Sequence, residues 1–449
     1  SHEAEIRAKP ATLASDRLRQ VGRSIDPCHM FLDLRGEDAE ALNALSSLYE
    51  RTQDWAKLTE VLERQVDIAA ADDDRVNLLT RRARVFSDRL QRDDLAVEDW
   101  NRVLDVDYAN LAALRSLAAI RRRHNDAAEL VNVLHMTVDR AGALLDEEEL
   151  KDIFRELGKT YGEVLGQPFD ASEAWRKLLD VGPDFEAFSA LEAIYHNEER
   201  WADVIDVKMQ RAAALEEPDA KVQELRTAAY LWRDRLEEPD SARTAYEKIL
   251  EIEPTNDEAY EALERLHTDA ERWEPLIELY LARLETREEP ADRTELLRKI
   301  ARIFEEKLDD KGQALDALVN AFTEDIFDRD TARYLERMAQ ATGRWGEVIQ
   351  IVNGLLTQET EADRKIRLCL HLAKWYGDDL GRPEYAQPYY AQIVQLDPNN
   401  VGALRQMGQL YRKSGNWQQL GATLTRALDV AVTDLDRKEI MTELGELLD

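Results

Sequence analysis

The stretch DPNNVGALRQMGQLYRKSGNWQQLGATLTRAL, residues 397–428, reads as two amphipathic helices joined by a tight turn. Asn400 stands where the side chain of an N-cap residue would accept the first free N–H groups of a helix, and Trp417 opens the second helix. Helices joined by so short a turn lie antiparallel. The organisation of the whole chain can be worked out from this helical hairpin.

The same hairpin recurs at a fixed interval. Before Trp417 the intervals are three of 72 residues, one of 74 and one of 72, and they reach Trp345, Trp273, Trp201, Ala127 and Trp55. Seventeen residues before each of these six anchors stands an Asn or Asp, namely Asp38, Asn110, Asp184, Asn256, Asp328 or Asn400. A period this long, with a helix cap and an aromatic residue in fixed places, predicts a solenoid.

Each repeat contains four helical segments. In the repeat 256–327 they are residues 257–267, 273–285, 293–308 and 313–324, each with Leu, Ile, Tyr or Phe on a single face. We predict an all-α solenoid of antiparallel hairpins in a single domain 1–449, with units 38–109, 110–183, 184–255, 256–327 and 328–399 and partial units 1–37 and 400–449. Two helices before Asp38, twenty in the full units and three at the end make about 25 helices.

Composition argues against several classes of ligand. A net charge of −32 makes nucleic acid an improbable partner and disfavours direct binding to anionic membranes. No apolar run approaches the length needed to span a bilayer. Cys28 and Cys369 lie 341 residues apart, so we expect small buried thiols and not a disulfide or a zinc site.

Residues suited to catalysis do not form a recognisable pattern. The seven histidines are scattered and never pair at the spacing of metal ligands. The sequence shows no glycine-rich phosphate loop, nucleophile elbow or HExxH pattern. We therefore predict a protein that is not an enzyme, with no catalytic residues, no metal site and no cofactor.

Residues 397–428 resemble the tetratricopeptide repeat. Leu404, Met407, Gly408, Tyr411, Leu420, Leu424 and Ala427 fall at the spacing of that motif, and Pro398 lies in the preceding turn. The resemblance extends over essentially the whole chain as alternating repeats of about 34 and 38 residues. It implies that the solenoid is a right-handed superhelix.

The chain departs from the family pattern at regular places. The family has a small residue early in its second helix, but the tryptophan-led helices carry Leu58, Leu130, Val204, Leu276, Val348 and Leu420 there. The small residue of the first helix is Ser46, Ala118 or Gly408 in three repeats, but Glu192, Glu264 or Glu336 in the other three. We therefore expect the two kinds of hairpin to pack differently.

The resemblance also implies where a partner would bind. In this family the first helix of each hairpin lines the concave surface, and partners lie there as extended peptides or helices. The corresponding basic residues are Arg84, Arg115, Arg122, Arg155, Lys159, Arg226, Arg233, Arg265, Arg298, Arg302, Arg333, Arg337, Arg367, Lys374, Arg405 and Arg412. Such a ladder would suit a carboxylate-rich ligand, such as an acidic peptide or helix. Alternatively, these residues pair with glutamates of adjacent helices or are solvated.

The six helix-opening positions invite two interpretations. Five of them are tryptophans, which could stack on a ligand, but their fixed place opposite a Leu or Tyr of the first helix favours packing in the core. Loss of one would then cost roughly 3–5 kcal/mol locally. The hairpin that has Ala127 in this position is the predicted weak point.

Together these features predict a non-catalytic scaffold that binds a protein segment in its concave groove and bridges components. The alternative is a regulatory or substrate-selecting arm of a larger multidomain enzyme or of a secretion, motility or cell-envelope assembly. Both ends fall inside a repeat and lack a polar capping helix, which predicts a longer protein, covering partners or end-to-end self-association. The cytoplasm is the default location, while the periplasm and cell surface stay open because the chain begins at Ser1.

Overall fold

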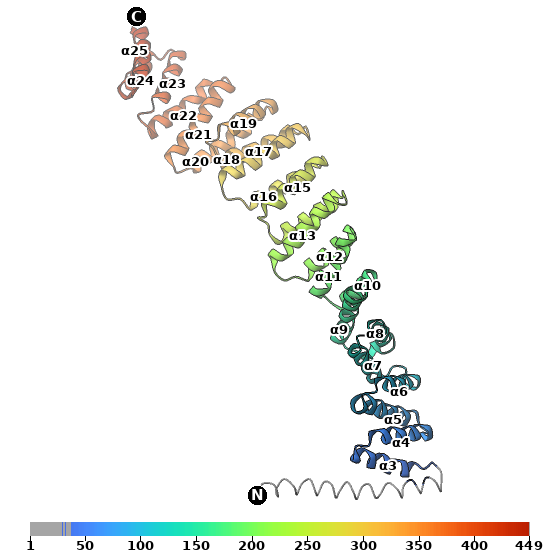
Figure 1. The fold of residues 1–449 in the computed structure, drawn as a ribbon. Coiled ribbons are helices and arrows are strands. Elements are labelled where there is room, and N and C mark those ends of the chain that lie inside the picture. The colour runs from blue at the N-terminus through green and yellow to red at the C-terminus, as the bar shows by residue number, and fades with distance from the viewer. Residues whose placement is uncertain (1–28, 30–31, 33–36, 449) are drawn as a thin grey trace, which may run out of the picture. The chain divides into compact units, whose positions relative to one another are not determined.

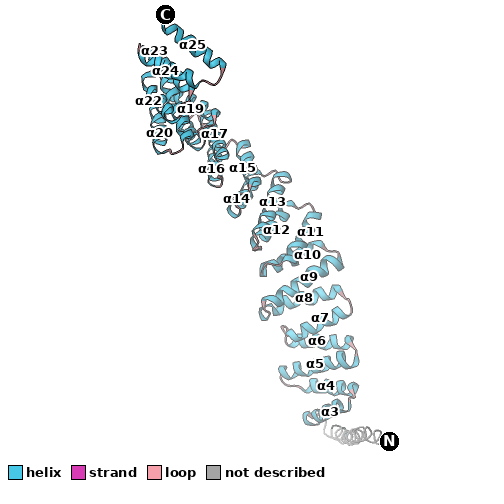
Figure 2. Ribbon diagram, turned by 90° about the vertical axis from the view of Figure 1, so that its left-hand side faces the viewer, coloured by secondary structure: helices cyan, strands magenta, loops and turns pink. Residues whose placement is uncertain are grey.

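The computed structural model describes residues 29, 32 and 37–448, and this part of the chain contains 23 α-helices, α3 to α25, and no β-strand. Consecutive helices run antiparallel along each of two compact halves, residues 1–231 and 232–449 (Figure 1, Figure 2). These observations confirm the predicted helical-hairpin solenoid and its count of twenty-three helices after Asp38. Cys28, the two helices expected before Asp38 and most of the partial unit 1–37 lie outside the described residues.

In the first half, the first and third helices of the repeats carry odd numbers: α3 (Ala39–Thr52), α5 (Asp72–Val85), α7 (Leu111–Arg123), α9 (Glu147–Lys159), α11 (Phe185–Asn197) and α13 (Pro218–Asp234). The second and fourth helices are α4 (Trp55–Ile68), α6 (Asp93–Val106), α8 (Ala127–Ala141), α10 (Pro168–Val181) and α12 (Trp201–Ala214). Helices α5 and α9 continue into π-helical turns, η1 (Phe86–Leu90) and η3 (Thr160–Leu165), and η2 (Gly142–Leu144) follows α8.

In the second half the odd-numbered helices are α15 (Asp257–Asp269), α17 (Pro290–Glu306), α19 (Arg329–Thr342), α21 (Ala362–Lys374), α23 (Val401–Lys413) and α25 (Asp434–Leu448). The even-numbered helices are α14 (Pro239–Ile252), α16 (Trp273–Glu285), α18 (Lys311–Glu324), α20 (Trp345–Gln358), α22 (Pro383–Leu396) and α24 (Trp417–Val430). The π-helical turn η4 (Trp375–Asp379) follows α21. Helix α17 begins three residues earlier than expected, because Pro290 occupies the first helical position, where its missing N–H costs nothing.

The predicted N-caps are confirmed in all six repeats. Each Asn or Asp side chain accepts a hydrogen bond from a backbone N–H two or three residues further on, for example Asp184 from Ala187 (2.8 Å) and Asn256 from Ala259 (2.9 Å). The others are Asp38, Asn110, Asp328 and Asn400. These caps set the start of the first helix in every repeat.

A second set of fixed positions ends the first and third helices. Every described residue with φ in the left-handed region lies in one of these turns, at Gln53, Gln91, Asn125, Gly166, Glu199, Glu237, Glu271, Asp309, Gly343, Gly381 and Gly415. After each third helix the N–H of one residue donates to a carbonyl oxygen six residues earlier, as Arg92 does to Phe86 (2.9 Å) and Asp310 to Phe304 (2.8 Å). The accepting residue is aromatic each time: Phe86, Tyr161, Trp232, Phe304 or Tyr376. These turns align the repeats residue by residue.

The core of each repeat lies between the fourth helix and its neighbours. In the sequence of each fourth helix a small residue stands four positions before a large one, and the pairs Ala96 with Trp100, Ala171 with Trp175 and Ala314 with Leu318 are all buried. Added bulk would not fit beside them, because a Cβ on Gly158 of α9 would lie 2.4 Å from the Trp175 ring. Cys369 is also buried, as expected.

The helix-opening tryptophans are less buried than expected, although Trp55 packs against the core of its repeat. Trp345 is buried, but Trp55, Trp201 and Trp273 are only partly buried, and Trp417 is 57% exposed. The first residue of a helix lies at the rim of the hairpin, where one ring face is left for a charged neighbour. Arg89 lies over Trp55 (5.0 Å to the ring centroid) and Lys307 lies over Trp273 (4.9 Å). Trp55 and Trp273 therefore form cation–π pairs at the rim of their hairpins.

Candidate functional site

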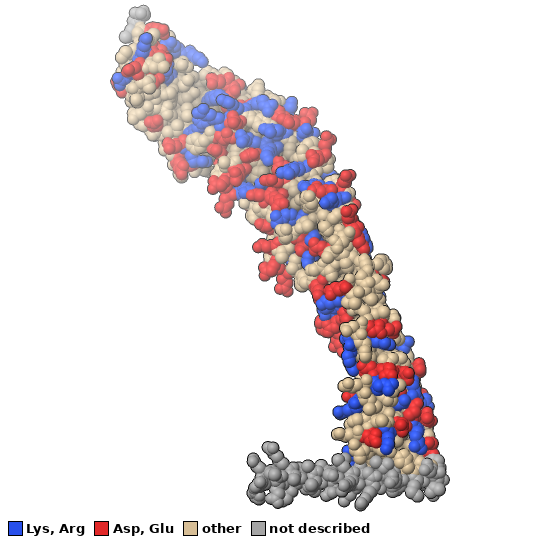
Figure 3. Space-filling view, in the orientation of Figure 1, with Lys and Arg blue, Asp and Glu red and all other residues tan. Residues whose placement is uncertain are grey.

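All sixteen basic residues predicted to contact a partner lie on odd-numbered helices. They are distributed over α5, α7, α9, α13, α15, α17, α19, α21 and α23. In the second half, Lys and Arg side chains gather over α17, α19 and α21, interspersed with acidic ones (Figure 3). We refer to the surface of the odd-numbered helices, within each half, as the odd face.

Ion pairs link neighbouring odd helices across this face in the first half. Arg115 and Arg122 of α7 contact Glu149 and Glu156 of α9, and the Arg122 pair has two contacts of 2.6 Å. On α9, Arg155 binds Asp184, the N-cap residue of α11, at 2.9 Å. Lys159 of α9 lies 2.8 Å from Glu186.

The second half repeats this pattern. Arg298 of α17 lies 3.2 Å from the N-cap residue Asp328, and Arg337 of α19 reaches back to Glu305 at 2.7 Å. Lys374 pairs with Glu336, Arg405 with Glu439 and Glu443, and Arg412 with Glu446. Much of the predicted ladder is therefore matched by a ladder of carboxylates from the same chain.

The acidic residues that replace the family's small residue have a clear role in this network. Glu264 accepts hydrogen bonds from Lys299 (2.9 Å) and the Tyr280 hydroxyl (2.7 Å). Glu336 likewise accepts from Lys374 and from the Trp375 indole N–H (2.9 Å). A carboxylate here binds donors from the following helices, so these hairpins have polar contacts where the family packs backbones closely. Burial would raise the pKa of Glu264, but the bonds from Lys299 and Tyr280 hold it below its ordinary value.

Four of the predicted residues form no ion pair with another helix and are exposed. The side chains of Arg265 and Arg333 are 74% and 76% exposed, and each pairs only with an acid of its own helix. Arg84 and Arg302 are exposed, and within the described part of the chain they form no ion pair. Arg265, Arg302 and Arg333 lie on three successive odd helices, α15, α17 and α19.

The remaining predicted residues have short-range contacts. Arg226 bonds to Gln223 of its own helix (2.7 Å), and Arg233 pairs with the adjacent Asp234 (2.7 Å). The Arg367 guanidinium lies over the Phe327 ring, 5.9 Å from its centroid.

Two further kinds of site, for a metal ion and for a membrane, were considered for the described residues by their geometry and hydropathy. No group of three or more His, Cys, Asp or Glu side chains there is arranged to hold a metal ion. None of the helices between residues 37 and 448 is long and apolar enough to cross a membrane.

A repeated helical hairpin with a charged odd face defines a class of α-solenoid. Within it, three stretches match the family model of the tetratricopeptide repeat: residues 41–76, 259–294 and 403–438. Each match begins three residues after an N-cap (Asp38, Asn256 or Asn400) and ends early in the third helix, so all three have the same register. The chain therefore contains tetratricopeptide repeats.

A comparison with solved structures finds similar chains. The structure of Naa15/Naa10 bound to HypK-THB matches over all of this chain and 66% of its own length, with 15% identity and a TM-score of 0.31. The C-terminal part of a TPR repeat-containing protein from Cytophaga hutchinsonii matches 56% of this chain and 98% of its own, at 14% identity and a TM-score of 0.26. The P58(IPK) TPR domain matches 92% and 98%, at 16% identity and a TM-score of 0.22. TM-scores this low carry no information about partners. A search of curated proteins finds no match.

Proposed function

We propose that the chain is a non-catalytic scaffold that binds a protein segment along its odd face. Tetratricopeptide repeats are in general protein-interaction modules, and three of them lie in register in this chain. The observation that supports the odd face most directly is the row of exposed arginines on α15, α17 and α19 that no neighbouring helix neutralises.

The basic residues that form ion pairs between helices support the fold and are not suited to testing this proposal. Arg155 and Arg298 bind N-cap carboxylates, so replacing them would damage the fold as well as any binding surface. Arg265, Arg302 and Arg333 can be changed without breaking an interhelical pair. An incoming carboxylate would form bidentate bonds with their guanidinium groups. We therefore expect an acidic, extended or helical segment as the ligand.

The test compares two triple variants with equal changes in charge. Immobilised chain would be used to capture proteins from a lysate of the source cells, with Arg265, Arg302 and Arg333 all changed to Glu in one variant. The matched control changes the exposed residues Arg140, Lys177 and Arg426 of even-numbered helices to Glu. Circular dichroism and thermal melting would establish that both variants are folded.

We expect a partner that is captured by the wild-type chain and the control but lost from the odd-face variant. Equal capture by all three proteins would place the binding surface elsewhere. A lack of any captured protein, or loss from both variants alike, would contradict the proposal, because neither result depends on the odd face.

A further inference from the structure

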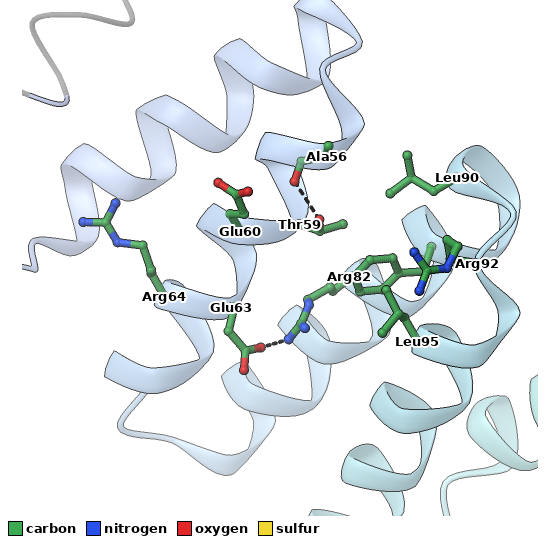
Figure 4. Close-up of a pocket in the computed structure, with 10 residues that line it drawn as sticks. Ala56, Thr59, Glu60, Glu63, Arg64, Arg82, Leu90, Arg92 and Leu95 are labelled. Atoms are coloured by element: carbon green, nitrogen blue, oxygen red, sulfur yellow. Dashed lines mark hydrogen bonds and ion pairs between the residues drawn. The ribbon is translucent and has the colours of Figure 1, made fainter.

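A cavity of about 670 Å³ opens in the first repeat between α4, the end of α5 with its turn η1, and α6, away from Arg265, Arg302 and Arg333 of the odd-face proposal. Helix α4 forms one wall, and the turn η1 and helix α6 form the other (Figure 4). Phe86, Leu90 and Leu95 provide its apolar lining, and Glu60, Glu63 and Arg82 stand among the charged residues beside them. Its size falls in the range of ligand-binding pockets.

The repeat that holds this cavity differs from the others in its core. Arg82 stands four residues before the turn aromatic Phe86, and the corresponding residues elsewhere are Leu157, Ala228, Ile300 and Leu372, all buried and apolar. Asp99 stands three residues after the helix-packing alanine, where other repeats have Ala174, Ala245, Ala317 and Tyr389. Asp99 is only 1% exposed, its carboxylate lies 3.4 Å from Arg82, and its Oδ2 has no hydrogen-bond partner.

A buried ion pair in place of apolar packing is weak as a source of stability. Its effect here is to hold a guanidinium at the wall of the cavity, where Arg82 also contacts Glu63 and lies over the Phe86 ring (5.2 Å). The cavity thus has a fixed floor of aromatic, aliphatic and charged groups.

One acidic residue that lines the cavity, Glu60, is not neutralised by a basic neighbour in the described structure. Besides Arg82, the basic lining residues are neutralised: Arg64 pairs with Glu37 (3.0 Å) and Arg92 with Asp94 (2.7 Å). Glu60 is exposed and has no ion pair within the described structure. The ligand that complements this site has an apolar group for Phe86, Leu90 and Leu95 and a cation for Glu60.

We propose that this cavity is a second docking site, which takes a large aliphatic side chain of a basic partner segment. The residue inserts between α4 and α6, and a neighbouring Lys or Arg pairs with Glu60. The net charge of −32 favours the approach of such a segment over long range. This site goes beyond the proposed odd-face function, because it lies between α4 and α6 in the first repeat and selects a ligand of the opposite charge.

The chain's own repeats suggest variants that the fold tolerates. Positions equivalent to Leu95 hold Asp170, Ser241, Gln313 and Tyr385, so Leu95→Gln removes apolar lining with little risk to folding. Glu60→Lys reverses the unpaired charge. Glu278→Lys is the matched control, because Glu278 is the exposed residue at the same position of α16.

The probe is a library of random twelve-residue peptides displayed on phage and selected on the immobilised full chain at physiological salt. We expect a class of peptides with Leu, Ile or Met beside Lys or Arg. Individual synthetic peptides of this class should lose about tenfold or more in affinity with Leu95→Gln and with Glu60→Lys, because hot-spot residues dominate such sites. Affinity should be unchanged with Glu278→Lys and with the odd-face triple variant.

Three results would overturn the proposal. The first is a selection that yields no peptide of this class. The second is that the selected peptides bind Leu95→Gln and Glu60→Lys as tightly as they bind the wild-type chain. The third is that Glu278→Lys weakens peptide binding as much as Glu60→Lys does, which would indicate attraction to acidic surface in general. Loss with the odd-face variant alone would likewise refute this second site, because the binding would then depend on a surface outside the cavity.

Discussion

Single residues with positive φ end the first and third helices of the repeats, and seven of the eleven are not glycine. An L-residue in this left-handed region costs roughly 1–2 kcal/mol relative to its normal conformation. Gln91 and Asp309 stand in turns whose equivalents in other repeats are Gly166 and Gly381. These turns therefore contain strain that glycine would remove.

We expect Gln91→Gly and Asp309→Gly each to stabilise the chain by about 0.5–1 kcal/mol, since part of the gain is offset by the greater freedom of glycine when unfolded. Urea unfolding of each single variant measures this change. Gly343→Ala is the reciprocal control: a Cβ there would meet no atom within 4 Å, so any destabilisation comes from the backbone. A loss of stability in both glycine variants would contradict this account of the turns.

A buried histidine makes the second half sensitive to acid. Burial lowers the pKa of His371 to about 4, with a smaller contribution from Arg367, while its Nε2–H donates to the Ile326 carbonyl oxygen (3.2 Å). The unfolded chain binds this proton near pH 6.5 and the folded chain only near pH 4, so stability falls as the pH drops through this window. We expect a loss of about 2–3 kcal/mol attributable to this residue.

Urea unfolding at several pH values would test this prediction. His371→Leu should be less stable at pH 7, because the Ile326 carbonyl oxygen loses its donor, but its stability should depend less on pH between 6.5 and 4. An unchanged pH dependence in the variant would show that other groups bind the protons.

At the scale of helices, the first repeat carries the ion pair Arg82–Asp99 in a place that is apolar elsewhere. We expect Arg82→Leu alone to destabilise by about 1–3 kcal/mol, because Asp99 stays buried and keeps only Arg102, 3.4 Å away, as a cationic partner. The double variant Arg82→Leu with Asp99→Ala, which imitates the other repeats, should be at least as stable as wild type. Thermal and urea unfolding would decide, and a double variant less stable than Arg82→Leu would contradict the argument.

Two helix-opening tryptophans, Trp55 and Trp273, lie under a cation of the third helix of their own repeat. Arg89 and Lys307 stand three residues after the turn aromatics Phe86 and Phe304, and in the repeat that has Ala127 in place of tryptophan the same position is Val164. We expect Ala127→Trp with Val164→Arg to stabilise the α7–α8 hairpin by about 1 kcal/mol more than the sum of the single changes. A double-mutant cycle measures this coupling, and a coupling near zero would show that the pair has no energetic role.

The local sequence pattern was sufficient to predict where most helices lie, but it was insufficient to predict which side chains are exposed on the surface. The N-caps and the small-to-large pairs were predictable because each depends on residues within one or two turns of helix. The exposure of Trp417 was not, because it depends on what covers a hairpin rim from another helix. Pairing with glutamates of adjacent helices was only one of the alternatives for the basic residues, although the sequence holds a signal for it: Arg122 and Glu156, or Lys374 and Glu336, differ by the 34 or 38 residues that separate successive odd helices.

At the scale of the whole molecule, the buried and helix-ending residues recur in each repeat, whereas the surface residues differ from repeat to repeat. The caps, turns and alanines recur, whereas the odd face mixes neutralised arginines with the exposed row on α15, α17 and α19, and one repeat adds the cavity beside α4. Stability in such an array is the sum of local terms, so surface residues can change without loss of the fold. This arrangement suits a scaffold that presents distinct binding positions along one chain.

The most direct test of this account is amide hydrogen exchange of the full chain, alone and with a partner captured by the wild-type protein. Binding along the odd face predicts slower exchange in α15, α17 and α19, with little change in α16, α18 and α20. Protection confined to the even-numbered helices, or no protection in any helix, would contradict the central claim that the odd face receives the partner.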